Sequence, residues 1–184
     1  MRVSQYRQRS PEGGFTLIDM LFTVALIGLL SSMAAPALMR ARGAAQASSA
    51  LATMRTINSG ELSFAISCGA GFYAADLPTL GMPPAGATDT FLPPDLTSAP
   101  SVIKGSYTVS LAATVLPGSP ATCNGLGMGS TAPSYAAVAD PLDPATQLPR
   151  YFGTNADGVI YEHSATLSAV MPESGSPPIG GPVK

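Results

Sequence analysis

The chain has 184 residues, of which 46% are hydrophobic and only 11% are charged. This charged fraction is low for a soluble globular protein, in which about 25% of the residues are charged. The formal net charge of −2 argues against a nucleic-acid-binding protein, because such proteins present a strongly basic surface. The 19 Gly and 18 Pro residues follow no collagen period and predict long irregular loops in part of the chain.

An uncharged stretch near the N-terminus is the strongest signal in the sequence. Met20–Met39 contains no charged residue, and about 20 residues suffice for a helix to cross the hydrocarbon layer of a membrane. Three arginines precede this stretch, namely Arg2, Arg7 and Arg9, and Arg40 and Arg42 follow it. We expect the short basic leading segment to stay in the cytoplasm, which places the rest of the chain outside it.

Two simple interpretations of this stretch are a secretory signal peptide and a plain membrane anchor. A signal peptide would be cut after its apolar core, and the small residues Ala34–Ala37 imitate such a site, although Pro36 is unfavourable beside a cut. A plain anchor fits the length. Neither explains Asp19, because an unpaired carboxylate in lipid costs about 2.5–3.5 kcal/mol and usually has a partner.

The residues from Gly13 to Asp19, Gly-Gly-Phe-Thr-Leu-Ile-Asp, resemble the cleavage motif of type IV prepilins. The resemblance implies that a membrane-bound prepilin peptidase cuts between Gly14 and Phe15 and methylates the new amine of Phe15. Gly14 suits a protease cleft because it has no side chain to hinder the backbone. Asp19 becomes the fifth residue of the mature chain, a place where the family usually carries Glu.

The same resemblance gives assembly roles to three residues. It implies that Asp19 pairs with the N-terminal amine of a neighbouring subunit, and a buried ion pair of this kind fixes register more than it adds stability. Near Gly28 and Pro36 the family also has a helix-breaking residue and a proline, where the helix melts locally in the filament. Both residues weaken a helix. The simpler alternatives are an acid at the membrane surface and the ordinary Gly and Pro of a membrane helix.

The helix is expected to continue well beyond the apolar stretch. Residues 37–67 contain no Pro, are rich in Ala and place apolar side chains at near-helical spacing. Cys68, Gly69 and Gly71 then predict the end of the helix. One helix is therefore expected over about residues 15–67, roughly 80 Å long at 1.5 Å per residue.

After the helix, the sequence predicts a loop and a small antiparallel sheet. Six prolines within residues 72–103 predict an irregular loop. Alternating apolar and polar residues predict a strand over 106–116 and a shorter one over 134–139. Residues 151–153 and 159–163 are expected to form a hairpin. A sheet of three or four strands is expected to cover the C-terminal half of the long helix.

The predicted fold class is therefore α+β, with a long N-terminal helix packed against a small antiparallel sheet, as in the pilin fold. Residues 1–14 are the expected cleaved leader. Residues 15–39 form the transmembrane or filament-core half of the helix, and residues 40–67 form its amphipathic half. Residues 68–173 are the expected globular domain, and residues 174–184 are the expected mobile tail.

Cys68 and Cys123 are the only cysteines. Outside the cytoplasm an even pair predicts one disulfide, which would tie the end of the helix to the loop after the first long strand. In the chain-entropy account a loop of this size contributes about 4 kcal/mol to stability. Two free thiols are the alternative.

The sequence predicts no enzyme, no cofactor and no metal centre. Asn155, Asp157 and Glu162 suggest calcium, as in the major pseudopilins of type II secretion, but their spacing matches no complete calcium loop and a plain turn is favoured. His163 is the only histidine, so no His-based triad or metal site is predicted. No phosphate loop, dinucleotide fingerprint or pair of catalytic carboxylates is present in the sequence.

The predicted function is that of a structural subunit of a type IV pilus-like filament. Its expected partners are further copies of itself, the prepilin peptidase and an assembly platform, and no nucleic acid. The precursor is expected in the inner membrane with its globular domain in the periplasm, and the assembled form at the cell surface. A pseudopilin of a type II secretion system is the nearest alternative, because both families share the leader. A membrane-anchored binding protein that does not polymerise is the alternative from another class.

Overall fold

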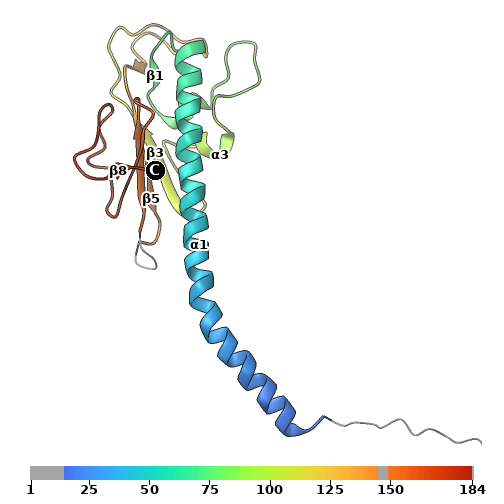
Figure 1. Ribbon diagram of the computed structural model, residues 1–184. Coiled ribbons are helices and arrows are strands. Elements are labelled where there is room, and N and C mark those ends of the chain that lie inside the picture. The colour runs from blue at the N-terminus through green and yellow to red at the C-terminus, as the bar shows by residue number, and fades with distance from the viewer. Residues whose placement is uncertain (1–14, 145–148, 184) are drawn as a thin grey trace, which may run out of the picture. The chain divides into compact units, whose positions relative to one another are not determined.

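The computed structural model describes residues 15–144 and 149–183 and has the predicted α+β fold, with one long helix and an antiparallel sheet (Figure 1). The chain divides into two compact units, residues 1–41 and 42–184. Helix α1, Leu17–Ser67, contributes to both units. This confirms the fold class expected from the sequence, an arrangement consistent with the pilin fold.

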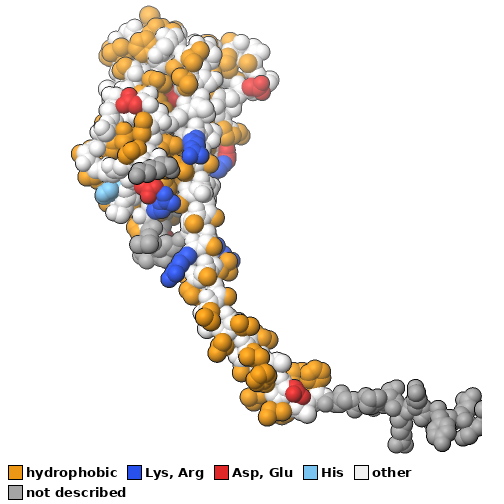
Figure 2. Space-filling model, in the orientation of Figure 1, with side chains coloured by type: hydrophobic (Ala, Val, Ile, Leu, Met, Phe, Trp, Pro, Cys, Tyr) orange, Lys and Arg blue, Asp and Glu red, His pale blue; other side chains and the backbone are white. Residues whose placement is uncertain are grey.

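In the first unit, the described residues form the start of α1, and their side chains are exposed throughout. Hydrophobic side chains are spread along the visible surface of this segment, among white polar side chains and backbone (Figure 2). The helix continues through Gly28 and Pro36 without interruption. The expected melting at these two residues concerns an assembled filament and stays a prediction.

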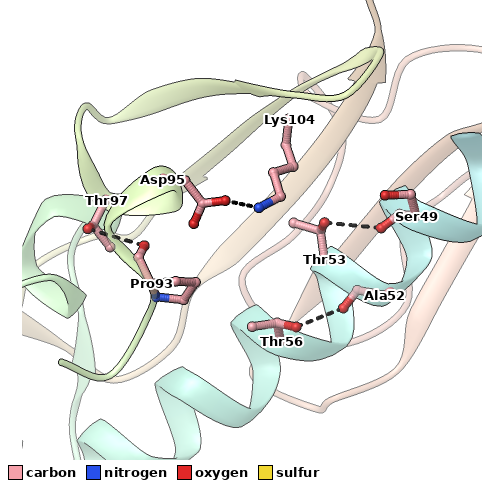
Figure 3. A network of polar contacts seen from close by, with 8 residues as sticks. All are labelled: Ser49, Ala52, Thr53, Thr56, Pro93, Asp95, Thr97 and Lys104. Atoms are coloured by element: carbon pink, nitrogen blue, oxygen red, sulfur yellow. Dashed lines mark hydrogen bonds and ion pairs between the residues drawn. The ribbon is translucent and has the colours of Figure 1, made fainter. Parts of the chain in front are cut away.

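In the second unit, α1 buries one face against the sheet and its connecting loops. The buried residues recur every three residues, in places with the next residue as well, which is the pattern of a single helix face. They are Ala47, Ala50, Thr53, Met54, Ile57, Gly60, Glu61, Phe64 and Ala65. Thr53 and Thr56 donate their hydroxyl protons to the carbonyl oxygens of Ser49 and Ala52, each over 3.0 Å (Figure 3). The hydroxyl of Thr53 is therefore satisfied within the helix and is tolerated at the edge of the core.

The helix ends where the sequence predicted. The amide of Gly69 donates to the carbonyl oxygen of Phe64 over 2.7 Å, and the amide of Gly71 donates to that of Ala65 over 2.8 Å. The carbonyl oxygen of Phe64 also accepts from the Cys68 amide over 2.8 Å. The bond from Gly71 satisfies the carbonyl of Ala65, which the end of the helix would otherwise leave unpaired. Ala70, between the two glycines, has a positive φ of 52°, which turns the chain away from the helix axis.

The main sheet has six antiparallel strands in the order β2-β3-β5-β6-β7-β8. Their bounds are Ser101–Lys104 (β2), Tyr107–Ala112 (β3), Ala136–Pro141 (β5), Tyr151–Asn155 (β6), Ile160–His163 (β7) and Gly181–Pro182 (β8). Val109, Leu111, Ala137, Ala139 and Phe152 join the same core as the buried face of α1. Alternate residues of the central strands therefore face the helix, as a sheet with one covered face requires.

The expected central strands and the hairpin of β6 and β7 are confirmed, but the expected number of strands was too small. β2 begins within residues 72–103, which were expected to be irregular, and ends one residue beyond them. It pairs with β3 through a tight turn in which Gly105 has a positive φ of 61°. β8 lies within the expected tail, and it is short enough to give no alternation in sequence. The mobility of residues 174–184 stays a prediction.

The proline-rich segment is also more ordered than its composition suggests. It contains β1 (Tyr73–Ala74), which pairs with β4 (Thr131–Ala132), and the one-turn helices α2 (Leu77–Leu80) and α3 (Pro94–Thr97). Four leucines of this segment are buried in the core, namely Leu77, Leu80, Leu92 and Leu96. An ion pair between Asp95 and Lys104 ties α3 to β2 (Figure 3). The segment therefore completes the core and does not merely connect the helix to the sheet.

Candidate functional site

The expected cleavage site lies at the edge of the described residues. Gly14 falls outside them, so the bond between Gly14 and Phe15 is not described by the structure. Phe15 precedes α1 and its side chain is 80% exposed. Its exposure is compatible with the expected methylation of its amine, which stays a prediction.

Asp19 lies in the first turn of α1 and is held there by Thr16. The amide and the hydroxyl of Thr16 both donate to Oδ2 of Asp19, over 3.2 and 2.5 Å. The amide of Asp19 donates in return to the Thr16 hydroxyl oxygen over 3.3 Å. This reciprocal arrangement is a capping box, which satisfies backbone donors at the start of a helix. The role of Thr16 was missed in the sequence, although Thr-x-x-Asp is a recognisable capping pattern.

The capping box leaves part of the Asp19 carboxylate available. Its Oδ1 atom accepts no hydrogen bond from the residues that the structure describes, and the side chain is exposed. The negative charge also lies near the positive end of the helix dipole, which favours it there. Asp19 is therefore fixed at a defined place with one oxygen free to accept a bond from a second molecule.

The segment that follows Asp19 presents an uncharged apolar surface. Its large hydrophobic side chains are between 45% and 72% exposed; they are Met20, Leu21, Phe22, Val24, Leu26, Ile27, Leu29, Leu30, Met33, Leu38 and Met39. Among the described residues, α1 is the one helix whose length and apolar composition suffice to cross a membrane. An apolar surface of this extent on a soluble protein marks a site of contact with a membrane or another protein.

Gly28 and Pro36 both lie within this exposed segment. No atom comes within 4 Å of the position that a Cβ would occupy on Gly28, so nothing in the chain itself requires a glycine there. A glycine without such an internal role allows another helix to approach closely. Pro36 has no amide hydrogen and leaves one carbonyl group of the preceding turn without its helical donor.

The predicted disulfide between Cys68 and Cys123 is confirmed, with 4.8 Å between the two Cα atoms. The Cys123 amide also donates to the Cys68 carbonyl oxygen over 3.2 Å. The bond ties the end of α1 to the loop that precedes β4. The bond lies in the second unit, residues 42–184, which is called the globular unit below, and it supports the packing of that unit.

A buried carboxyl group, Glu61, was missed in the sequence. Its side chain lies on the buried face of α1 and is 0% exposed. The amide of Ala74 in β1 donates to Glu61 Oε2 over 2.9 Å, whereas Oε1 has no hydrogen-bond partner among the described residues. Burial raises the pKa of Glu61 from 4.5 to about 8; the bond from Ala74 opposes this rise and the charge of Asp76 adds to it. Glu61 is therefore mainly protonated at neutral pH.

Asn58 connects α1 to the sheet one turn earlier. Its Oδ1 atom accepts hydrogen bonds from the hydroxyls of Tyr135 and Thr154, over 2.8 and 2.9 Å. Its Nδ2 atom donates to the carbonyl oxygen of Gly158 over 3.1 Å. The turn between β6 and β7 is thereby fixed against the helix.

Asn58 also lines a groove of about 710 Å³ between α1 and the turn that joins β6 to β7. The apolar lining includes Tyr73 and Tyr135, whose ring centroids are 5.1 Å apart. Arg55 and Asp157 supply opposite charges. A groove with apolar walls and a few polar groups has the general character of a binding site.

The residues considered for calcium do not form a ligand set. Asn155 donates its side-chain amide to the carbonyl oxygens of Pro172 and Gly175, and its Oδ1 accepts from the amide of Asp157. Glu162 forms an ion pair with Arg150. Within residues 15–144 and 149–183, no group of three or more His, Cys, Asp or Glu side chains is placed to hold a metal ion. The amide of Gly158 donates to the carbonyl oxygen of Asn155 over 2.9 Å, which closes a turn at these residues.

His163 lies at the end of β7, where its Nδ1 atom accepts a hydrogen bond from the amide of Ala165 over 3.0 Å.

Comparisons of the chain with protein-family models, curated proteins and solved structures found no match.

Proposed function

We propose that this protein is a structural subunit of a type IV pilus-like filament, cut by a prepilin peptidase after Gly14 and polymerised through the first half of α1. The observation that carries the proposal is the exposed, uncharged surface of residues 20–39, headed by one fixed carboxylate, Asp19. A surface of this kind is stable in a membrane before assembly and between other apolar helices after it.

In this proposal Asp19 accepts a bond from the amine that cleavage creates on Phe15 of a neighbouring copy. The free Oδ1 atom supports this role, because Thr16 occupies only Oδ2. Burial of the apolar segment drives packing, whereas the ion pair selects one register among many possible ones. The globular unit, braced by the Cys68–Cys123 disulfide, is carried on the outside.

The test is to express the full chain with a prepilin peptidase and an assembly platform, and to compare Asp19→Ala with Asp19→Glu. We expect Asp19→Ala to be cut normally. Its yield of sheared filament is expected to be lower than that of the wild type by roughly ten-fold or more, because the variant loses a buried charge pair. Asp19→Glu keeps the charge and is expected to assemble. Normal filament yield from Asp19→Ala would refute the assembly role.

The same features suit a pseudopilin of a type II secretion system, whose short filament moves folded proteins outward. Genes for a retraction ATPase beside the coding sequence favour a pilus, and genes for a secretion channel favour the pseudopilin.

The groove beside Asn58 favours a second candidate function, a membrane-anchored binding protein that does not polymerise. That function predicts an uncut leader and a dispensable Asp19. This function would be supported by a chain in the membrane fraction that still begins at Met1, together with unchanged ligand capture by Asp19→Ala.

A further inference from the structure

The charges on the exposed start of α1 are arranged in a simple way. Residues 15–41 contain only two ionisable side chains, Asp19 and Arg40, and all the residues between them are uncharged. Arg40 is exposed and forms no ion pair with any residue that the structure describes. Among the other described cations, Lys104 and Arg150 form ion pairs, whereas Arg42 and Arg55 do not.

Asp19 and Arg40 cannot meet within one copy of the chain. They are 21 residues apart on one helix, which corresponds to about 31 Å at 1.5 Å per residue. Two parallel copies at the same height would place Asp19 beside Asp19 and Arg40 beside Arg40, so that like charges repel. A displacement of about 31 Å along the helix axis instead brings the Asp19 of one copy to the Arg40 of the other.

We propose that Arg40 is a second assembly residue, whose guanidinium group binds the Asp19 carboxylate of another copy displaced by about 31 Å along the filament. This inference rests on the proposed filament function. The partner is a second copy in parallel orientation, because every copy has the same charge bias across the membrane. The contact is identified by the opposite charges of Asp19 and Arg40, which flank the uncharged residues 20–39.

The geometry of Asp19 suits this contact. Thr16 occupies Oδ2 and leaves Oδ1 free, and a carboxylate has enough lone pairs to accept from the guanidinium group and from an N-terminal amine together. Arg40 presents five N–H donors, which suit a carboxylate better than the single point charge of an ammonium group. The Arg40 contact thus specifies a large axial displacement between two copies, about 31 Å. The contact with the amine of Phe15 specifies a smaller displacement between neighbouring copies.

Zero-length cross-linking tests the contact directly. Arg40→Lys keeps the charge and supplies an amine, which a carbodiimide joins to a carboxylate only when the two groups touch. Arg42→Lys is the matched control, since it is two residues away and faces another side of the helix. We expect digestion of Arg40→Lys filaments to yield a peptide joined through an amide between Asp19 and position 40, and the control filaments to lack the equivalent peptide.

Filament yield provides the second readout. We expect Arg40→Gln to lower sheared filament by roughly ten-fold or more, with normal cleavage, and Arg42→Gln to remain near the wild type. Filaments of Arg40→Lys that lack the Asp19 cross-link, or a normal yield from Arg40→Gln, would overturn the pairing and leave the filament function intact. If the wild-type chain forms no filament and its N-terminus is not Phe15, both proposals fail.

Discussion

Replacing Glu61 by Gln is expected to remove most of the pH dependence of the stability of the globular unit. Glu61 is fully buried, and only one of its carboxyl oxygens has a hydrogen-bond donor, the amide of Ala74. The charged form is therefore strongly disfavoured in the folded state, whereas the unfolded chain exposes the carboxyl group to water. The negative charge of Asp76 disfavours ionisation of Glu61 further.

The magnitude follows from the pKa of Glu61 in the two states. A rise from 4.5 to about 8 on folding, at about 1.4 kcal/mol for each pH unit, corresponds to about 5 kcal/mol. Because the folded-state pKa is the higher one, this stability is fully present below about pH 4.5 and is lost as the pH rises to about 8. Gln has a similar shape and no charge, so the variant lacks this loss.

The measurement is urea unfolding of the full chain in detergent micelles at about pH 4.5, 6 and 8, with the disulfide intact. Near-ultraviolet circular dichroism of the tyrosines reports on the core, because Tyr73 and Tyr135 pack there in edge contact. The quantity to compare is the change in unfolding free energy between the lowest and highest pH. We expect it to be several kcal/mol larger in the wild type than in Glu61→Gln. Parallel pH curves for the two proteins would refute the account of Glu61.

Three further changes test the globular unit by the same assay. The double variant Cys68→Ala with Cys123→Ala is expected to lower the unfolding free energy by about 4 kcal/mol, because the disulfide closes a separation of 55 residues. Reduction of the wild type should have the same effect. An unchanged unfolding midpoint would contradict this. Gly69→Ala would place a Cβ 2.1 Å from a backbone oxygen and is expected to cost about 1–3 kcal/mol. Gly127→Ala is its control, since no atom lies within 4 Å of that position, and equal effects of the two would argue against the steric explanation. Asn58→Ala leaves the hydroxyl of a buried tyrosine without its acceptor and is expected to cost about 1–3 kcal/mol; a wild-type midpoint would show that the bond is dispensable.

The long helix was predictable because its signals are local. The uncharged run of Met20–Met39 and the glycines that follow Cys68 set its length and its end, and both are read directly from neighbouring residues. The disulfide was predictable for another reason: with only two cysteines there is a single possible pairing. The capping box of Thr16 and Asp19 was also within reach of sequence, since it depends on residues three apart.

The features that were missed depend on contacts between distant residues. Glu is a residue type usually found on the exposed face of a helix. The burial of Glu61 is decided by Ala74 and the loops that cover it. β8 has two residues, and a strand of that length shows no alternation; only its pairing with β7 defines it. The groove likewise combines α1 with the turn at Gly158, which the sequence separates by about 100 residues.

The most direct test of the filament proposal is mass spectrometry of the N-terminus of the protein recovered from sheared cell-surface filaments. The account predicts a mature chain that begins at methylated Phe15, which would report cleavage, export and polymerisation together. A chain in the membrane fraction that still begins at Met1, or one cut near Ala35, would contradict it and favour an anchored or secreted binding protein.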